Sequence, residues 1–182
     1  MLTLPSVTFR RRAPLLSAIL VLTLLAGCAR EIVPPCPPVR VDNATATLTK
    51  FKDGPGRDVT DIEYQAEIVG YKGHCDFSTS SVEVIFDVDI ALTSGPAVTG
   101  GTAPLYYFVA VPQFFPDPAG KQIMQVTRKL PAKPALRETF TESGARVRIP
   151  LKPEQAGASF DVYIGFQLDN AQLEYNRTRM QR

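Results

Sequence analysis

Few residues of this 182-residue chain have the types and spacing that catalysis needs. His74, Cys75 and Asp76 form a cluster of metal-ligand types, but zinc sites use three or four ligands at set spacings, and no second His or Cys pair accompanies these residues. His74 is also the only histidine, and no Gly-x-Ser-x-Gly sequence accompanies it. The sequence therefore predicts no metal site and no serine hydrolase.

Three carboxylates, Glu83, Asp87 and Asp89, share one side of a predicted strand. Acids two residues apart on a strand stand about 6–7 Å from each other, which is within the range that glycosidases use. An outward acidic face is also what any solvated strand presents, and the sequence supplies no apolar pocket for a general acid. We therefore expect no enzymatic activity and no cofactor, with a carboxylate-based hydrolase as the alternative.

The amino-terminal segment has the pattern of a secretory signal peptide. Arg10, Arg11 and Arg12 precede the uncharged, apolar stretch from Ala13 to Ala26. This stretch is shorter than the roughly 20 residues that cross a bilayer as a helix. Without residues 1–27 the chain keeps 17 basic and 18 acidic residues, a net charge of −1. That charge predicts no nucleic-acid partner.

The sequence Leu25-Ala26-Gly27-Cys28 resembles the bacterial lipobox. The resemblance implies cleavage before Cys28, acylation of its thiol and, because Ala29 replaces the aspartate of an inner-membrane retention signal, an outer-membrane anchor facing the periplasm. An ordinary cleaved signal peptide is the alternative. We expect a signal peptide over residues 1–27, a lipidated, proline-rich tether over 28–38 and one domain over 39–182.

Two further cysteines, Cys36 and Cys75, form an even pair in a chain that we expect to be exported. An oxidising compartment favours a disulfide between them. Two free thiols are the alternative.

Alternation of apolar and polar residues dominates the predicted domain and indicates half-buried strands. The predicted strands are 39–51, 62–68, 82–92, 105–111, 122–130, 138–141, 146–151 and 160–168, with turns at 52–56, 94–96, 117–120 and 143–144. We expect an all-β sandwich of seven or eight antiparallel strands. The stretch 149–153 before Phe160 resembles the corner of immunoglobulin and fibronectin III domains, which implies a sandwich of that type.

The end of the chain predicts a short helical turn over 171–175, capped by Asp169 or Asn170. Together with the lipobox, Cys36 and Cys75, the segments Gly165-Phe166-Gln167-Leu168 and Gln172-Leu173-Glu174-Tyr175-Asn176-Arg177 resemble a family of uncharacterised proteobacterial lipoproteins. The resemblance implies no known activity.

Aromatic residues supply the candidate contact surface: Tyr106, Phe108, Phe114, Phe115 and Tyr175. Phe114 and Phe115 are adjacent in a proline-rich loop, so one is expected to face the core and the other solvent, unless both pack beneath the loop. We expect a non-enzymatic, lipid-anchored envelope protein that serves as an accessory or assembly subunit for another envelope protein. The alternative is a module that binds a glycan or another small ligand.

Overall fold

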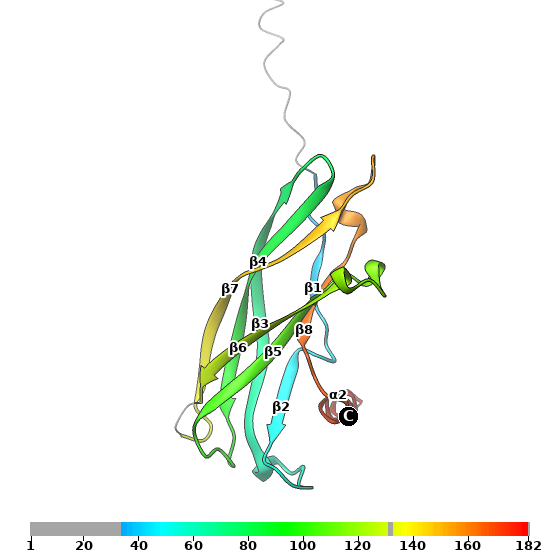
Figure 1. Ribbon diagram of the computed structural model, residues 1–182. Coiled ribbons are helices and arrows are strands. Elements are labelled where there is room, and N and C mark those ends of the chain that lie inside the picture. The colour runs from blue at the N-terminus through cyan, green and yellow to red at the C-terminus, as the bar shows by residue number, and fades with distance from the viewer. Residues whose placement is uncertain (1–33, 131–132, 182) are drawn as a thin grey trace, which may run out of the picture. The chain divides into compact units, whose positions relative to one another are not determined.

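The computed structural model describes residues 34–130 and 133–181 (Figure 1). The predicted signal peptide and lipidation site Cys28 lie outside these residues. The described residues form two four-stranded sheets and one α-helix near the C-terminus. The protein is therefore mostly β, as the alternation predicted.

The first sheet has the order β1-β8-β5-β6 and the second has the order β2-β3-β4-β7. Their bounds are β1 (Val39–Val41), β2 (Thr47–Phe51), β3 (Ile62–Phe77), β4 (Ser81–Ser94), β5 (Thr102–Ala110), β6 (Lys121–Lys129), β7 (Arg137–Pro150) and β8 (Val162–Phe166). One hydrophobic core contains buried residues from both sheets, and this gives a β-sandwich-like arrangement.

Strand β4 shows how the alternation builds this core. Its apolar residues Val82, Phe86 and Ile90 are at most 1% exposed. The intervening residues Glu83 and Asp87 are only partly buried. Successive side chains point to opposite faces of a strand, so the apolar set of β4 faces the other sheet.

The strand predicted over 39–51 is two strands in different sheets. A turn separates β1 from β2, and in it the Thr45 N–H and hydroxyl donate to the backbone oxygen and carboxylate of Asp42. Short β1 pairs with β8 in parallel, so the prediction of an entirely antiparallel sandwich was wrong for this pair. The other five pairings are antiparallel.

The predicted turn at Ser143-Gly144 lies inside one continuous strand, β7. Gly144 has a φ of +78° beside a register shift in the β4–β7 pairing. The Asp87 carboxylate accepts a hydrogen bond from the Gly144 N–H at 3.0 Å. Glycine permits this conformation, so the strand forms a bulge and continues instead of reversing.

Helix α2 (Asn170–Met180) is longer than the predicted turn. Asp169 caps it and forms a capping box with Gln172. Buried Asn176 donates from its side-chain nitrogen to the backbone oxygens of Ala44 at 2.9 Å and Thr47 at 2.7 Å. These tertiary contacts explain why the helix extends past residue 175.

We expect Asn176→Ala to lower the free energy of unfolding by about 1–3 kcal/mol, because two carbonyl oxygens lose their donor. Urea denaturation would measure this change. Thr178→Ala is the control on the same helix, since Thr178 is exposed and its hydroxyl donates only to the oxygen of Glu174. Equal losses in the two variants would contradict the role assigned to Asn176.

Candidate functional site

Three of the residues considered for catalysis, Cys75, Asp87 and Asp89, make structural contacts in the fold. Cys75 forms a disulfide, and exposed His74 lies beside it on β3. The Asp89 carboxylate accepts the Thr141 hydroxyl at 2.6 Å. Within residues 34–130 and 133–181, no group of three or more His, Cys, Asp or Glu residues is placed to hold a metal ion.

The predicted disulfide between Cys36 and Cys75 is present, with a Cα–Cα distance of 5.9 Å. It fastens the proline-rich segment before β1 to β3, the longest strand of the second sheet, two residues before that strand ends. The Tyr71 hydroxyl makes a second link by donating to the backbone oxygen of Val39 at 2.5 Å. Together the two links hold the start of the described chain against β3.

The loop between β5 and β6 is held by backbone hydrogen bonds. It contains two 3₁₀ turns, Pro112–Phe114 and Pro118–Gly120 (Figure 1). At its base the Val111 N–H donates to the oxygen of Gly120 at 2.8 Å. Nearer the tip, the Asp117 N–H donates to the oxygen of Phe114 at 2.7 Å. These bonds give the loop a defined conformation.

The two phenylalanines of this loop have different environments. The Phe114 ring packs against Phe160, with 5.4 Å between ring centroids. Phe115 is 86% exposed, the largest fraction among the exposed large hydrophobic residues of the described chain. One ring is therefore packed and the other lies in solvent, as in one of the two predicted alternatives, but Phe114 lies in a 3₁₀ turn, so the alternation of an extended segment is not the reason.

An open groove of about 480 Å³ adjoins the packed ring. It is lined by Gln113, Phe114, Pro150, Leu151, Lys152, Gln155, Ser159 and Phe160. The β5–β6 loop and the segment after β7 thus form a mostly apolar depression whose lining also includes polar side chains. Exposed Phe115 follows directly in sequence after the lining residue Phe114.

The other predicted contact residues lie elsewhere. Tyr106 is 41% exposed on the outer side of β5. On the same side the Lys121 ammonium lies 4.4 Å from the centroid of the Phe108 ring. A Cβ at Gly165 would lie 2.8 Å from Phe108 Cζ, so this ring lies against the backbone of β8. The Tyr175 ring packs edge-on against Phe51. The five aromatics therefore form no single platform.

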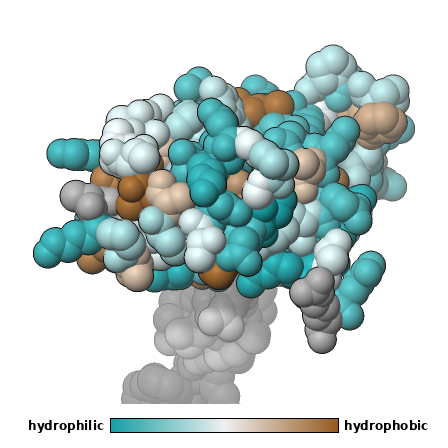
Figure 2. Space-filling view, turned by 90° about the horizontal axis from the view of Figure 1, so that it is seen from below, coloured by the Kyte–Doolittle hydropathy of each residue, from teal (hydrophilic) through white to brown (hydrophobic). Residues whose placement is uncertain are grey.

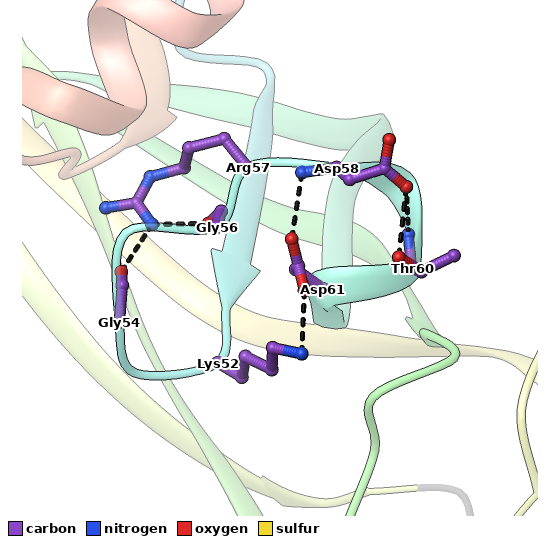
Figure 3. A network of polar contacts seen from close by, with 7 residues as sticks. All are labelled: Lys52, Gly54, Gly56, Arg57, Asp58, Thr60 and Asp61. Carbon is purple, nitrogen blue, oxygen red and sulfur yellow. Dashed lines mark hydrogen bonds and ion pairs between the residues drawn. The ribbon is translucent and has the colours of Figure 1, made fainter.

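A polar network at the loop over 52–61 was missed, because the sequence indicated only a turn (Figure 3). The Lys52 ammonium lies 2.7 Å from the Asp61 carboxylate, which also accepts the Asp58 N–H. The Arg57 guanidinium donates to the backbone oxygens of Gly54 and Gly56. The Asp58-x-x-Asp61 spacing of a capping box was the available signal.

The contacts of this loop also shift the pKa of one of its acidic side chains, Asp61. The hydrogen bond from Lys52 and the one from the Asp58 N–H lower the pKa of Asp61 below its ordinary value of 3.8. A pocket of about 280 Å³ lies alongside and is lined in part by Lys50, Lys52, Arg57 and Asp169. The Lys50 ammonium lies 3.7 Å from the Asp53 carboxylate, so the loop's backbone oxygens and acids bind all three of these cations, and we assign this pocket a structural role.

Because the pKa of Asp61 is lower in the folded protein, its contribution to stability is present above pH 3.8 and is lost as pH falls through the folded value. Asp61→Asn should therefore lower stability at neutral pH and make it less dependent on pH on the acid side. Urea denaturation at neutral pH and at about pH 3 would test this expectation. An unchanged pH dependence would contradict it.

The end of the molecule seen in Figure 2 is mainly hydrophilic, with apolar residues scattered over it. Among the described residues no helix has the length and apolar character needed to cross a membrane. Comparison with protein-family models, with curated proteins and with solved structures finds no match for this chain. The functional proposal therefore depends on the geometry of the domain. The clearest feature of that geometry is the exposed Phe115 ring on the loop beside the groove.

Proposed function

We propose that this protein is a non-enzymatic, lipid-anchored accessory or assembly protein of the bacterial cell envelope. In this proposal residues 1–27 direct export, and acyl chains on Cys28 hold the chain in the outer membrane on its periplasmic side. The β domain binds another envelope protein. The disulfide between Cys36 and Cys75 supports the exported location, because such bonds persist in oxidising compartments.

We further propose that the two sheets belong to the immunoglobulin or fibronectin III type of sandwich. The support is the repeated crossing of the chain between sheets, at β1–β2, β4–β5, β6–β7 and β7–β8. The parallel β1–β8 pair and the helix that follows β8 depart from the usual arrangement. This proposal concerns the type of sandwich and not its function.

One observation carries the functional proposal: Phe115 is 86% exposed on a hydrogen-bonded loop beside an apolar groove. A loop whose backbone is already fixed loses little backbone entropy on binding, and buried aromatic side chains dominate protein interfaces. A glycan site is less well supported, because the candidate aromatics are separated on the sheet, the loop and the helix. A protein partner with an apolar pocket is therefore favoured.

Photo-crosslinking in living cells tests this function. A photoreactive amino acid at position 115 should give one specific adduct with another envelope protein, and the same substitution at Val59 should not. Val59 is a suitable control because it is 64% exposed on a different loop. Equal crosslinking from both positions, or none from position 115, would contradict the proposal. Mass spectrometry of the amino-terminal peptide tests acylation of Cys28 separately.

A further inference from the structure

Strand β6 lies at an end of the first sheet, and in the described part of the chain it pairs with β5 alone. Two hydrogen bonds show which backbone groups it leaves free. Leu130 N–H donates to Gly101 at 3.0 Å and Val111 N–H donates to Gly120 at 2.8 Å, so the even-numbered residues of β6 bond to β5. The N–H and C=O groups of Lys121, Ile123, Gln125, Thr127 and Lys129 therefore point away from the sheet.

Each of the other three sheet edges has a feature that limits pairing. On β1 the Tyr71 hydroxyl occupies the backbone oxygen of Val39. On β2 the Asn176 side chain occupies the oxygen of Thr47. Strand β7 has the bulge at Gly144 and alternating charges. Proteins use such features to prevent strand addition at sheet edges.

Strand β6 has none of these features over its centre. The segment Gln122–Thr127 contains no charge, proline or glycine, and its pairing with β5 has no register shift. Ile123 is 54% exposed at this edge. An uncharged strand centre with no bulge and with free backbone groups is suited to pairing with another strand. Charges occur near its ends, where Lys121 and Lys129 are exposed.

We propose that β6 binds an extended segment of the partner protein as an added strand, and that this segment carries acidic residues opposite Lys121 and Lys129. This inference rests on the proposed function, because it names how the partner is bound. Backbone hydrogen bonds of the added strand supply affinity, and the two lysines select by charge. Phe115 belongs to the loop that leads into Lys121, so a partner strand that extends past this end of β6 would approach that loop.

The same lysines disfavour a second copy of this chain as the occupant. In full-length antiparallel pairing of two β6 strands, Gln125 faces itself and Lys121 faces Lys129 of the other copy at both ends. Like charges directly opposite each other destabilise a strand pair. The β6 edge is therefore complementary in charge to a strand with acidic residues at both ends, and not to a second β6 strand.

A pair of peptides tests the proposal on the full chain in detergent solution. One synthetic peptide, as long as β6, has glutamate at both ends and alternating threonine and valine between them; the other has lysine at both ends. We expect the glutamate peptide to bind at least about tenfold more tightly in fluorescence anisotropy. Equal affinities, or no binding of the glutamate peptide, would overturn the proposal.

Gln125→Pro shows whether binding uses the free edge. The Gln125 N–H points away from β5, so proline removes an outward donor and leaves the β5–β6 hydrogen bonds intact. We expect this variant to bind the glutamate peptide at least about tenfold more weakly, and Gln125→Ala to stay within about twofold of the native chain. Equal binding by the two variants would overturn the proposal.

A second variant needs no peptide and tests the same edge. Lys129→Glu places a glutamate opposite Lys121 at both ends of a self-paired β6, so it should increase self-association at least about tenfold in analytical ultracentrifugation. Lys133→Glu, an equal charge change at an exposed position outside β6, should not. Adding Gln125→Pro to Lys129→Glu should abolish the gain. No gain in Lys129→Glu would overturn the proposal.

These measurements separate the two proposals. The peptide and self-association experiments use purified protein and report only on β6. Crosslinking at position 115 reports on an envelope partner in cells. Specific crosslinking with no peptide discrimination would reject strand addition and keep the proposed function. The reverse result would reject the proposed function and keep a strand-binding edge.

Discussion

Phe115→Ala should weaken binding to the crosslinked envelope partner by roughly 30-fold or more, which corresponds to about 2 kcal/mol. The expectation follows from the exposure of this ring, since an aromatic side chain that is free in solvent gains most when a partner pocket buries it. The free energy of unfolding should change by less than about 0.5 kcal/mol, because the ring makes little contact within the domain. Titration calorimetry with the partner and urea denaturation would measure the two quantities.

Phe114→Ala is the matched comparison. Its ring packs against Phe160 and lines the groove, so this variant should lose stability as well as binding. Val59→Ala, at another exposed apolar position, should change neither. The contact role assigned to Phe115 would be rejected if Phe115→Ala bound like the native chain.

Replacing both Cys36 and Cys75 with serine should lower the free energy of unfolding by about 4 kcal/mol in the chain-entropy account. The bond closes a loop between residues 39 positions apart, so its removal restores much conformational freedom to the unfolded chain. The variant should also release the segment before β1, while the Tyr71 hydroxyl still donates from β3 to the backbone oxygen of Val39.

Thermal denaturation with and without a reducing agent would measure this effect. The native chain should lose stability on reduction, and the doubly substituted chain should not respond. The single variants Cys36→Ser and Cys75→Ser should match the double variant, because each already lacks the bond. An unchanged midpoint in the double variant would show that the other contacts of this segment hold it unaided.

Local pattern was enough to find most strands of this fold. The six apolar residues at alternate positions in 82–92 predicted the buried face of β4, because side chains alternate across a strand whatever its neighbours are. The disulfide followed from an even pair of cysteines in a chain expected to be exported. For Phe114 and Phe115, packing of one ring and exposure of the other was one of the two predicted alternatives, although a 3₁₀ turn and not strand alternation produces it.

Local pattern could not predict the continuation of β7 and β3 or the full length of α2, because these features depend on contacts between segments distant in sequence. Gly144 carries a turn signal, yet β4 lies alongside and the Asp87 carboxylate binds its N–H, so the strand continues. Strand β3 extends past Gly70 and Gly73 for the same reason, because β4 pairs with it to Phe77. Helix α2 passes Tyr175 because Asn176 finds its two acceptors on a segment more than a hundred residues away.

Residue order therefore specified the inward side of the clearly alternating strands and one disulfide, since both depend on residue types alone. The neighbours of each strand, the parallel β1–β8 pair and the free backbone groups of β6 arose from packing between distant segments. Hydrogen-bonding groups of a backbone are the same in every residue, so whether an edge is occupied depends on which segments the fold brings beside it.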